Sequence, residues 1–324
     1  MQLLKPLLCK HLLMAILACA AQGAWAQPFG FVALGDLPYG QAAQGYMPYK
    51  ALIRSINQER PIFSIHVGDF KSGSTLCSDE ESKVQLGHFG LFDSALVYTP
   101  GDNEWTDCHR GNNGGYDPLE RLQALRSVFY PVGLSLGKRP LAVQNQSASM
   151  PAFANFVENL RWQHQDVVFA TLHIVGSNNN FEVRDPRAVA EFFEREKANI
   201  AWIREAFASA AQTQAKAIVL AMQADVFEAK SQWEDFPAHS GFRASIGETL
   251  LPLAAQSKIP VLVIHGDSHV FRFDQPFMLN KKPLPQLTRL EVPGAGDVRA
   301  VHVTVDTRQR NPFAVRLLEP VAAP

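Results

Sequence analysis

The sequence predicts an α/β fold, and two observations support this prediction. Short apolar runs alternate with segments whose apolar residues recur at helical spacing. The strand-helix units repeat at similar length, as right-handed crossovers into a shared sheet require. Hydrophobic residues make up 47% of the chain. Such a chain buries one large core, so we expect a single globular domain.

Buried apolar runs predict the strands. In chain order they cover 29–34, 62–67, 95–99, 167–175, 217–222 and 261–265. After residue 267 the helical pattern stops. We expect the remaining runs to be antiparallel strands that close a sheet, over 289–292, 301–305 and 313–318.

Helical spacing and capping pairs predict the helices. They are expected over 49–56, 79–92 and 118–130, and over a long segment that begins at 186. Asp117-Pro118 and Asp185-Pro186 each place an N-cap residue before a first-turn proline. Both pairs therefore predict a helix start.

The first 26 residues have the pattern of a secretory signal. Two lysines precede an apolar run over 12–21, and Ala-Trp-Ala at 24–26 fits the small-x-small rule of signal peptidase. This run is shorter than the roughly 20 residues that span a bilayer. We therefore expect residues 1–26 to be a signal peptide and the protein to be periplasmic or secreted, without a later transmembrane segment. A retained anchor and lipidation at Cys19 are the alternatives.

Residues 27–324 are interpreted as one domain, and the segment 132–151, rich in Gly, Ser, Gln and Pro, as a surface insertion. Loss of the signal removes two lysines and no acid, so the formal charge changes from 30 − 31 = −1 to 28 − 31 = −3. A surface so close to neutral gives no reason to expect binding to nucleic acid. The oligomeric state is not indicated.

Two cysteines, Cys77 and Cys108, lie outside the signal. In an exported protein they most simply form one disulfide, which would contribute roughly 3 to 4 kcal/mol by loop entropy. Two free buried thiols are the alternative.

The dipeptide Gly-Asp follows four of the predicted strands and contributes Asp36, Asp69, Asp102 and Asp267. In an open α/β sheet, ligands bind beyond the carboxyl ends of the strands, so we expect these side chains to converge. Carboxylates brought together repel one another unless protons or cations neutralise them. The pattern therefore predicts a metal site, although an Asp after Gly also caps ordinary turns.

In motif order the chain resembles the calcineurin-like metallophosphoesterases, which have a four-layer α/β/β/α sandwich with mixed sheets. Gly35-Asp36 matches the first block, with Pro38 at the position of a metal-binding His. Gly68-Asp69 matches the second block, whose Asp bridges two metals.

The later blocks match in part. In the third, Asp102 stands at an Asn ligand and Asn103 at the catalytic His, and a shift of one residue would make Asn103 the ligand instead. In the fourth, Gln223 stands at a His ligand. In the fifth, Asp267 and His269 take the two His positions. Several metal-ligand histidines are thus replaced.

The resemblance implies two divalent metal ions. The candidate ligands are Asp36, Asp69, Asp102, Asn103, Gln223, Asp267 and His269. Because most of these side chains offer oxygen, Mg, Mn or Ca is favoured over Zn or Fe.

The resemblance also implies hydrolysis of small-molecule phosphate mono- or diesters by a metal-bridging hydroxide. Asn103, Glu104 and His269 are the candidate catalytic residues. Since Asn103 cannot donate and regain a proton, protonation of the leaving group falls to His269, Glu104 or water. The alternative function is a catalytically impaired protein of the same fold that binds a cation or a phosphorylated ligand.

Overall fold

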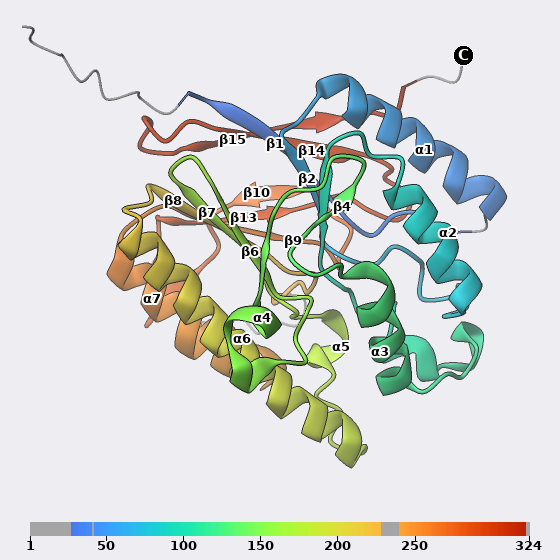
Figure 1. The fold of residues 1–324 in the computed structure, drawn as a ribbon. Coiled ribbons are helices and arrows are strands. Elements are labelled where there is room, and N and C mark those ends of the chain that lie inside the picture. Colours follow the sequence, from blue (N-terminus) through green and yellow to red (C-terminus); the bar gives the residue numbers. More distant parts are fainter. Residues whose placement is uncertain (1–26, 41, 228–239, 322–324) are drawn as a thin grey trace, which may run out of the picture.

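The computed structural model describes residues 27–40, 42–227 and 240–321. Two large mixed sheets pack face to face between helices, which gives the four layers seen in Figure 1. The predicted four-layer α/β/β/α architecture is confirmed. The expected signal peptide, 1–26, lies outside the described residues.

The first sheet has six strands in the order β15-β14-β1-β2-β3-β4. Its central strands β1, β2 and β3 are parallel, and the outer strands are antiparallel to their neighbours. The bounds are β1 Phe29–Leu34, β2 Phe63–His66, β3 Ala95–Tyr98, β4 Leu136–Gly137, β14 Ala300–Val305 and β15 Phe313–Leu318.

The second sheet has seven strands in the order β10-β13-β9-β8-β7-β6-β5. Here β7, β8, β9 and β13 are parallel. The bounds are β5 Gln144–Asn145, β6 Leu160–His164, β7 Val167–Thr171, β8 Ala217–Ala221, β9 Val261–His265, β10 Arg272–Asp274 and β13 Leu287–Glu291. A separate hairpin pairs β11 (Met278–Leu279) with β12 (Lys282–Pro283).

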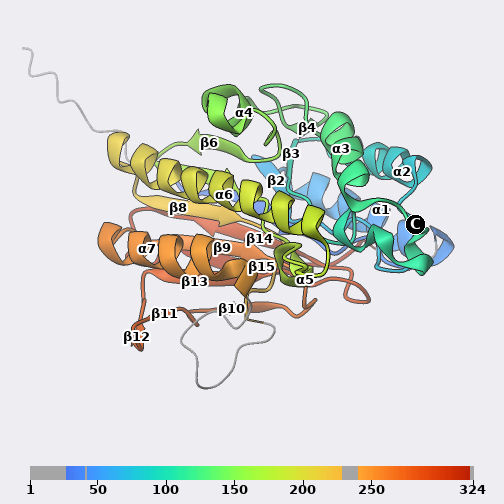
Figure 2. The same cartoon turned by 90° about the horizontal axis from the view of Figure 1, so that it is seen from below.

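Helices cover the outer face of each sheet. On one side lie α1 (Ala42–Glu59), α2 (Asp79–Phe89) and α3 (Pro118–Phe129), and on the other α6 (Pro186–Gln212) and α7 (Leu251–Ser257), which run side by side in Figure 2. A π-helical segment, Arg243–Leu250, leads into α7, and α4 (Gln146–Ser149) and α5 (Gly176–Asn179) are single turns. No helix of the described ranges is long and apolar enough to cross a membrane.

Local sequence explains the helix starts. The Asp117 carboxylate accepts hydrogen bonds from the amides of Leu119 and Glu120, and Asp185 caps α6 through the amide of Arg187. Each cap satisfies an amide that has no partner within its helix. Both predicted helix starts are confirmed.

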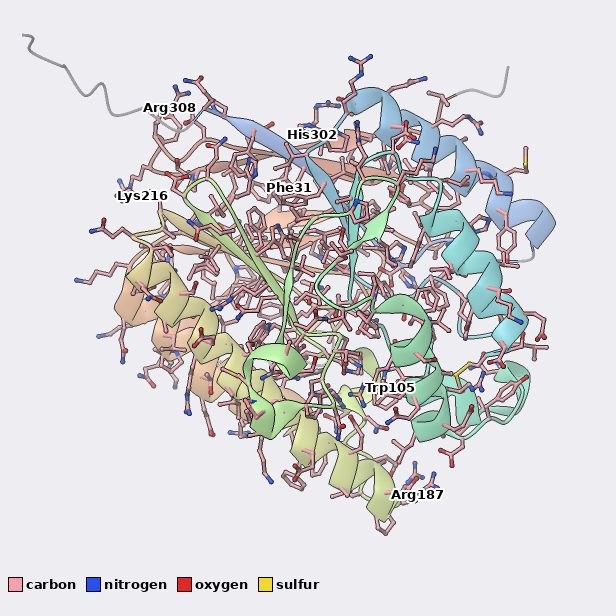
Figure 3. All side chains as sticks on the ribbon, viewed as in Figure 1. Phe31, Trp105, Arg187, Lys216, His302 and Arg308 are labelled. Carbon is pink, nitrogen blue, oxygen red and sulfur yellow. A yellow bond between two sulfur atoms is a disulfide. The ribbon has the colours of Figure 1, made fainter. Side chains whose placement is uncertain are left out.

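The core between the sheets is aromatic. Phe31 of the first sheet meets Phe169 of the second at 5.6 Å between ring centroids, and Phe31 lies inside the molecule in Figure 3. Along β7, Val167 and Phe169 face this core, while Val168 and Ala170 face the helices. The second sheet is therefore buried on both faces, as parallel strands usually are.

One topological expectation is confirmed only in part. The predicted strand 289–292 corresponds to β13, which pairs antiparallel with β10 but parallel with β9, through Leu287–Val261 and Glu291–His265. β10 precedes β13 in the chain and lies at the edge of the sheet. β14 and β15 close the first sheet as antiparallel strands, as expected. The segment 132–151, interpreted as a surface insertion, supplies the edge strands β4 and β5 and the turn α4.

Candidate metal centre

Four loops meet at the carboxyl ends of the parallel strands. Asp36 follows β1, Asp69 follows β2, Asp102 follows β3 and Asp267 follows β9. The amide of Asp267 donates to Oδ1 of Asp36 at 3.1 Å, and the amide of Asn103 donates to Oδ1 of Asp69 at the same distance. Hydrogen bonds thus join loops of the two sheets and loops within the first sheet.

Asp69, Asp102 and Asp267 form a three-carboxylate cluster, in which one oxygen from each residue lies within 4.8 Å of the others. Asp69 and Asp102 are buried and Asp267 is half-buried. Carboxylates packed this closely repel one another in a medium of low dielectric constant. The cluster is therefore suited to a cation.

Asp36 and His269 form a second part of the site beside this cluster. Nε2 of His269 lies 3.4 Å from Oδ1 of Asp36, and the His269 ring stands edge-on to the ring of Tyr39. Asp36 is fully buried, whereas the side chain of His269 is 34% exposed. His269 is therefore accessible from solvent.

The backbone of these loops is strained where the side chains converge. Asp36, Asp69, Asp267 and His269 all have positive φ, at 52°, 56°, 78° and 62°. Residues other than glycine seldom adopt this conformation, and it persists where the surrounding structure holds it and where function uses it.

Burial and charge shift the protonation of the site. Burial, followed by the charge of Asp102, raises the pKa of Asp69 well above its ordinary value of 3.8. Burial also raises the pKa of Asp36. For His269, burial opposes the charged ring, but the hydrogen bond and charge of Asp36 outweigh it and raise the pKa above 6.5. The site thus retains protons more readily than isolated side chains do.

Two solved structures are similar to this chain over nearly its whole length. A dimetal phosphatase from Danio rerio has 9% identity and a TM-score of 0.54, and the match covers 90% of this chain and 99% of that one. The anchor protein GAP50 of the inner membrane complex of Plasmodium has 13% identity and a TM-score of 0.50, over 91% and 90% of the two chains. The chain has the calcineurin-like metallophosphoesterase fold. Neither a family model nor a curated protein matches the sequence.

In this metallophosphoesterase fold, Asp102 and Asn103, the residues of the third block, make different kinds of contact in the site. Asp102 lies in the three-carboxylate cluster. Nδ2 of Asn103 donates to Oδ2 of Asp69 and to the hydroxyl of Tyr39, both at 2.7 Å. Asn103 therefore presents donors to the site, and Asp102 presents an acceptor.

Glu104 holds the backbone beneath the site. Its oxygens accept from the amides of Phe70 at 2.9 Å and Gly101 at 3.1 Å, and from the hydroxyl of Tyr98. The residue is 3% exposed. These contacts engage both oxygens, so Glu104 holds the loops after β2 and β3 in place, and its role as a proton donor stays a prediction.

Gln223 reaches the cluster from the loop after β8. Its Nε2 lies 3.1 Å from Asp102, 3.0 Å from Asp267 and 3.4 Å from Asp69, while its Oε1 accepts from the amide of Gly176. The side chain expected to be a metal ligand thus directs N–H groups, and not oxygen, at the carboxylates.

Sequence reasoning gave little weight to two further residues. The hydroxyl of Tyr39 donates to Asp69 at 2.8 Å, and that of Ser177 donates to Asp102 at 2.8 Å. Ser177 lies in a left-handed turn, with φ near 50° from Ser177 to Asn180. The run of Asn after the β7 strand was a signal for such a turn, because Asn tolerates this conformation.

The predicted disulfide is confirmed. Cys77 and Cys108 are bonded with their Cα atoms 5.8 Å apart, and the bond links the segment before α2 to the short turn Thr106–His109. That turn begins four residues after Asp102. The bond therefore restrains one wall of the site.

These residues fit a divalent cation. Carboxylate oxygens that converge within 4.8 Å match the oxygen ligands that hard cations such as Mg, Mn and Ca prefer. The raised pKa of Asp69 shows that burial and the neighbouring carboxylates disfavour its charged form. A bound cation would relieve this cost. Pro38 and Gln223, which stand where the family resemblance predicts ligand histidines, contribute no imidazole.

Proposed function

We propose that this chain is an exported, metal-dependent phosphoesterase that hydrolyses small-molecule phosphate mono- or diesters. The observation that carries the proposal is the three-carboxylate cluster at the carboxyl ends of β2, β3 and β9. Its place on a fold shared with a dimetal phosphatase supports a phosphoryl substrate. The ligand set among the described residues is rich in carboxylate oxygen, which favours Mg, Mn or Ca as the metal.

We assign two cation positions to the site. The three-carboxylate cluster is one, and Asp36 and Asp69, whose charges interact, provide the other. Bound cations would supply positive charge that polarises the phosphoryl group and favours deprotonation of the attacking water. Water attacks phosphorus, the P–O ester bond breaks, and the leaving oxygen takes up a proton.

His269 is the proton donor that the geometry favours for the leaving oxygen. Its side chain is 34% exposed, so a substrate can reach it. Asp36 raises its pKa, which increases the protonated fraction near neutral pH. Asn103 and Ser177 orient Asp69 and Asp102 by donating hydrogen bonds to them.

Elemental analysis and a phosphatase assay on the purified protein test this proposal. We expect bound or added Mg, Mn or Ca to support turnover of p-nitrophenyl phosphate or bis-p-nitrophenyl phosphate. Asp69→Asn should abolish it, since Asp69 belongs to both cation positions. Asp93→Asn is the matched control, because Asp93 makes an ion pair on the surface with half of its side chain exposed. No turnover with any of these cations would contradict the proposal.

A second candidate is a binding protein on the same fold. It is favoured by Asn103 and Gln223, which direct amide groups at the carboxylates where the family has imidazoles. The similarity to GAP50, which is described as an anchor, also supports a non-catalytic role. Cation binding that Asp69→Asn removes, without turnover, would favour this candidate.

A further inference from the structure

The amide group of Gln223 lies at the point where the three-carboxylate cluster converges. Its Nε2 is 3.0 Å from Oδ1 of Asp267, 3.1 Å from Oδ1 of Asp102 and 3.4 Å from Oδ2 of Asp69. An amide nitrogen carries two hydrogens, so three carboxylates share two donors. The polarised N–H groups therefore offset part of the negative charge of all three residues.

Gly176 fixes the orientation of this amide. Its backbone N–H donates to Oε1 of Gln223 at 2.6 Å, and Gln223 is fully buried. Rotation of the amide by half a turn would direct oxygen at the carboxylates and N–H at the N–H of Gly176. Both contacts are repulsive, so the hydrogen-bond network selects the orientation with nitrogen toward the cluster.

The backbone of Gln223 is held from both sides as well. Its N–H donates to the carbonyl of Ile174, and its carbonyl accepts from the amide of Gly266. The same segments carry Gly176 and Asp267, which contact the Gln223 side chain. The side chain is therefore kept in place by the elements that form the site, and its withdrawal would break hydrogen bonds.

From this geometry we infer that Gln223 acts as an internal competitor for the cation at the three-carboxylate cluster. A cation that shares the same oxygens must displace the amide and leave the N–H of Gly176 without its partner. Gln223 therefore lowers the affinity of the cluster for a cation. This inference rests on the metal centre assigned under the proposed function.

Calorimetric titration of Mn²⁺ and Ca²⁺ into the full-length mature protein tests the inference. Gln223→Glu keeps the shape of the side chain and the acceptor for Gly176, but replaces the donors with an oxygen. We expect this variant to bind a cation at the cluster at least about tenfold more tightly than the wild type. Gln123→Glu, which makes the same change at an exposed position of α3, is the control and should bind as the wild type does.

Thermal unfolding gives a second readout that does not depend on turnover. In chelator, Gln223→Glu should unfold at a lower temperature than the wild type, because a fourth carboxylate then faces the cluster. Added cation should reverse this difference. If Gln223→Glu is too unstable to purify, Gln223→Ala removes the competitor without adding charge and should also bind a cation at the cluster more tightly.

The gain in affinity must come from the cluster itself. Adding Asp102→Asn to Gln223→Ala should remove the gain, since Asp102 is one of the three acceptors. Cation affinity that falls in both single Gln223 variants would overturn the inference and identify Gln223 as a ligand, whatever the turnover. A rise in affinity without turnover in the wild type would support the inference and contradict the phosphoesterase proposal.

Discussion

The hydroxyl oxygen of Tyr39 lies 2.8 Å from Oδ2 of Asp69 and accepts a hydrogen bond from Asn103 at 2.7 Å. Tyr39 therefore links the loop after β1 to the loops after β2 and β3. Burial, followed by the charge of Asp69, raises its pKa, so the phenol remains neutral and continues to donate.

Tyr39→Phe should lower the free energy of unfolding in chelator by about 1.5 to 3 kcal/mol, the usual contribution of a hydrogen bond to a charged group. A bound cation should reduce this loss, because it neutralises Asp69 directly. Urea unfolding with and without Mn²⁺ measures both values. Tyr46→Phe removes a hydrogen bond to Glu81 at a half-buried position and should show no dependence on cation.

The contribution of the site's carboxylates to stability in chelator should fall as pH rises. The raised pKa values of Asp69 and Asp36 mean that these two groups hold more protons in the folded chain than in the unfolded chain above the ordinary value of 3.8. Their contribution therefore declines from that pH upward through the raised folded pKa. Burial raises the pKa of Asp107 to about 6, which adds to the decline between 3.8 and about 6.

His269 also contributes stability that falls as pH rises. The raised pKa of His269 contributes stability that is complete below 6.5 and is lost as pH rises through the folded value. The difference in unfolding free energy between the wild type and Asp69→Asn, measured from about pH 4 to about pH 8, isolates the contribution of Asp69. A difference that does not vary with pH would show that Asp69 titrates normally.

A methyl group at Gly176 should disturb the cluster. A Cβ atom there would lie 2.7 Å from Asp267 and 2.9 Å from Asp102. We expect Gly176→Ala to cost about 1 to 3 kcal/mol and to weaken cation binding. Gly87→Ala is the control. No atom lies within 4 Å of that position in α2, so the substitution should raise stability by about 0.5 to 1 kcal/mol.

A buried ion pair lies behind the site. Glu158, fully buried, accepts from Nε of Arg126 at 3.0 Å and contacts Nδ1 of His173 at 2.7 Å. Burial opposes the charge of Glu158, but Arg126 and His173 outweigh it and lower its pKa. Arg126→Met would leave this charge without its partner and should cost about 3 to 5 kcal/mol.

The matched control for this pair is on the surface. Arg187, at the outer end of α6 in Figure 3, pairs with Asp117 while 59% of its side chain is exposed. Arg187→Met should therefore change stability by about 0 to 1 kcal/mol. Equal losses in the two variants, measured by urea unfolding, would show that burial of Glu158 adds nothing.

Removal of the disulfide should reduce stability and cation affinity together. The Cys77–Cys108 bond spans a sequence separation of 31, for which loop entropy gives roughly 3 to 4 kcal/mol. The double variant Cys77→Ser/Cys108→Ser should lose about this amount in urea unfolding. It should also bind Mn²⁺ more weakly, because the bond restrains the turn after Asp102. An unchanged affinity for Mn²⁺ would show that the disulfide stabilises the fold without affecting the site.

Much of the fold could be predicted because its signals are local. The apolar runs that became β1, β9 and β15 were predicted at their observed bounds, and the aspartate-proline pairs predicted the starts of α3 and α6. The parallel pairing of β13 with β9 was not predicted. Periodicity records which residues are buried, but not which neighbour a strand pairs with or in which direction.

Some features of the candidate site were likewise predictable from local sequence, and others were not. Gly-Asp at the end of each strand indicated which aspartates meet, because the carboxyl ends of parallel strands share an edge. The direction of the Gln223 amide was not predictable, since the N–H of Gly176 lies 47 positions away in the sequence and selects it. Nor was the position of Glu104, whose partners include Phe70, 34 positions earlier.

Local patterns in the sequence predicted the central strands, two helix caps and the aspartates at the strand ends, since these features depend on residues close together in the chain. The tertiary structure alone decided which acceptor each donor meets. Tyr39 with Asp69, and Gln223 with the three-carboxylate cluster, are pairings between loops of different strands. Hydrogen bonds require distances near 3 Å, and only the packing of the two sheets brings these atoms that close.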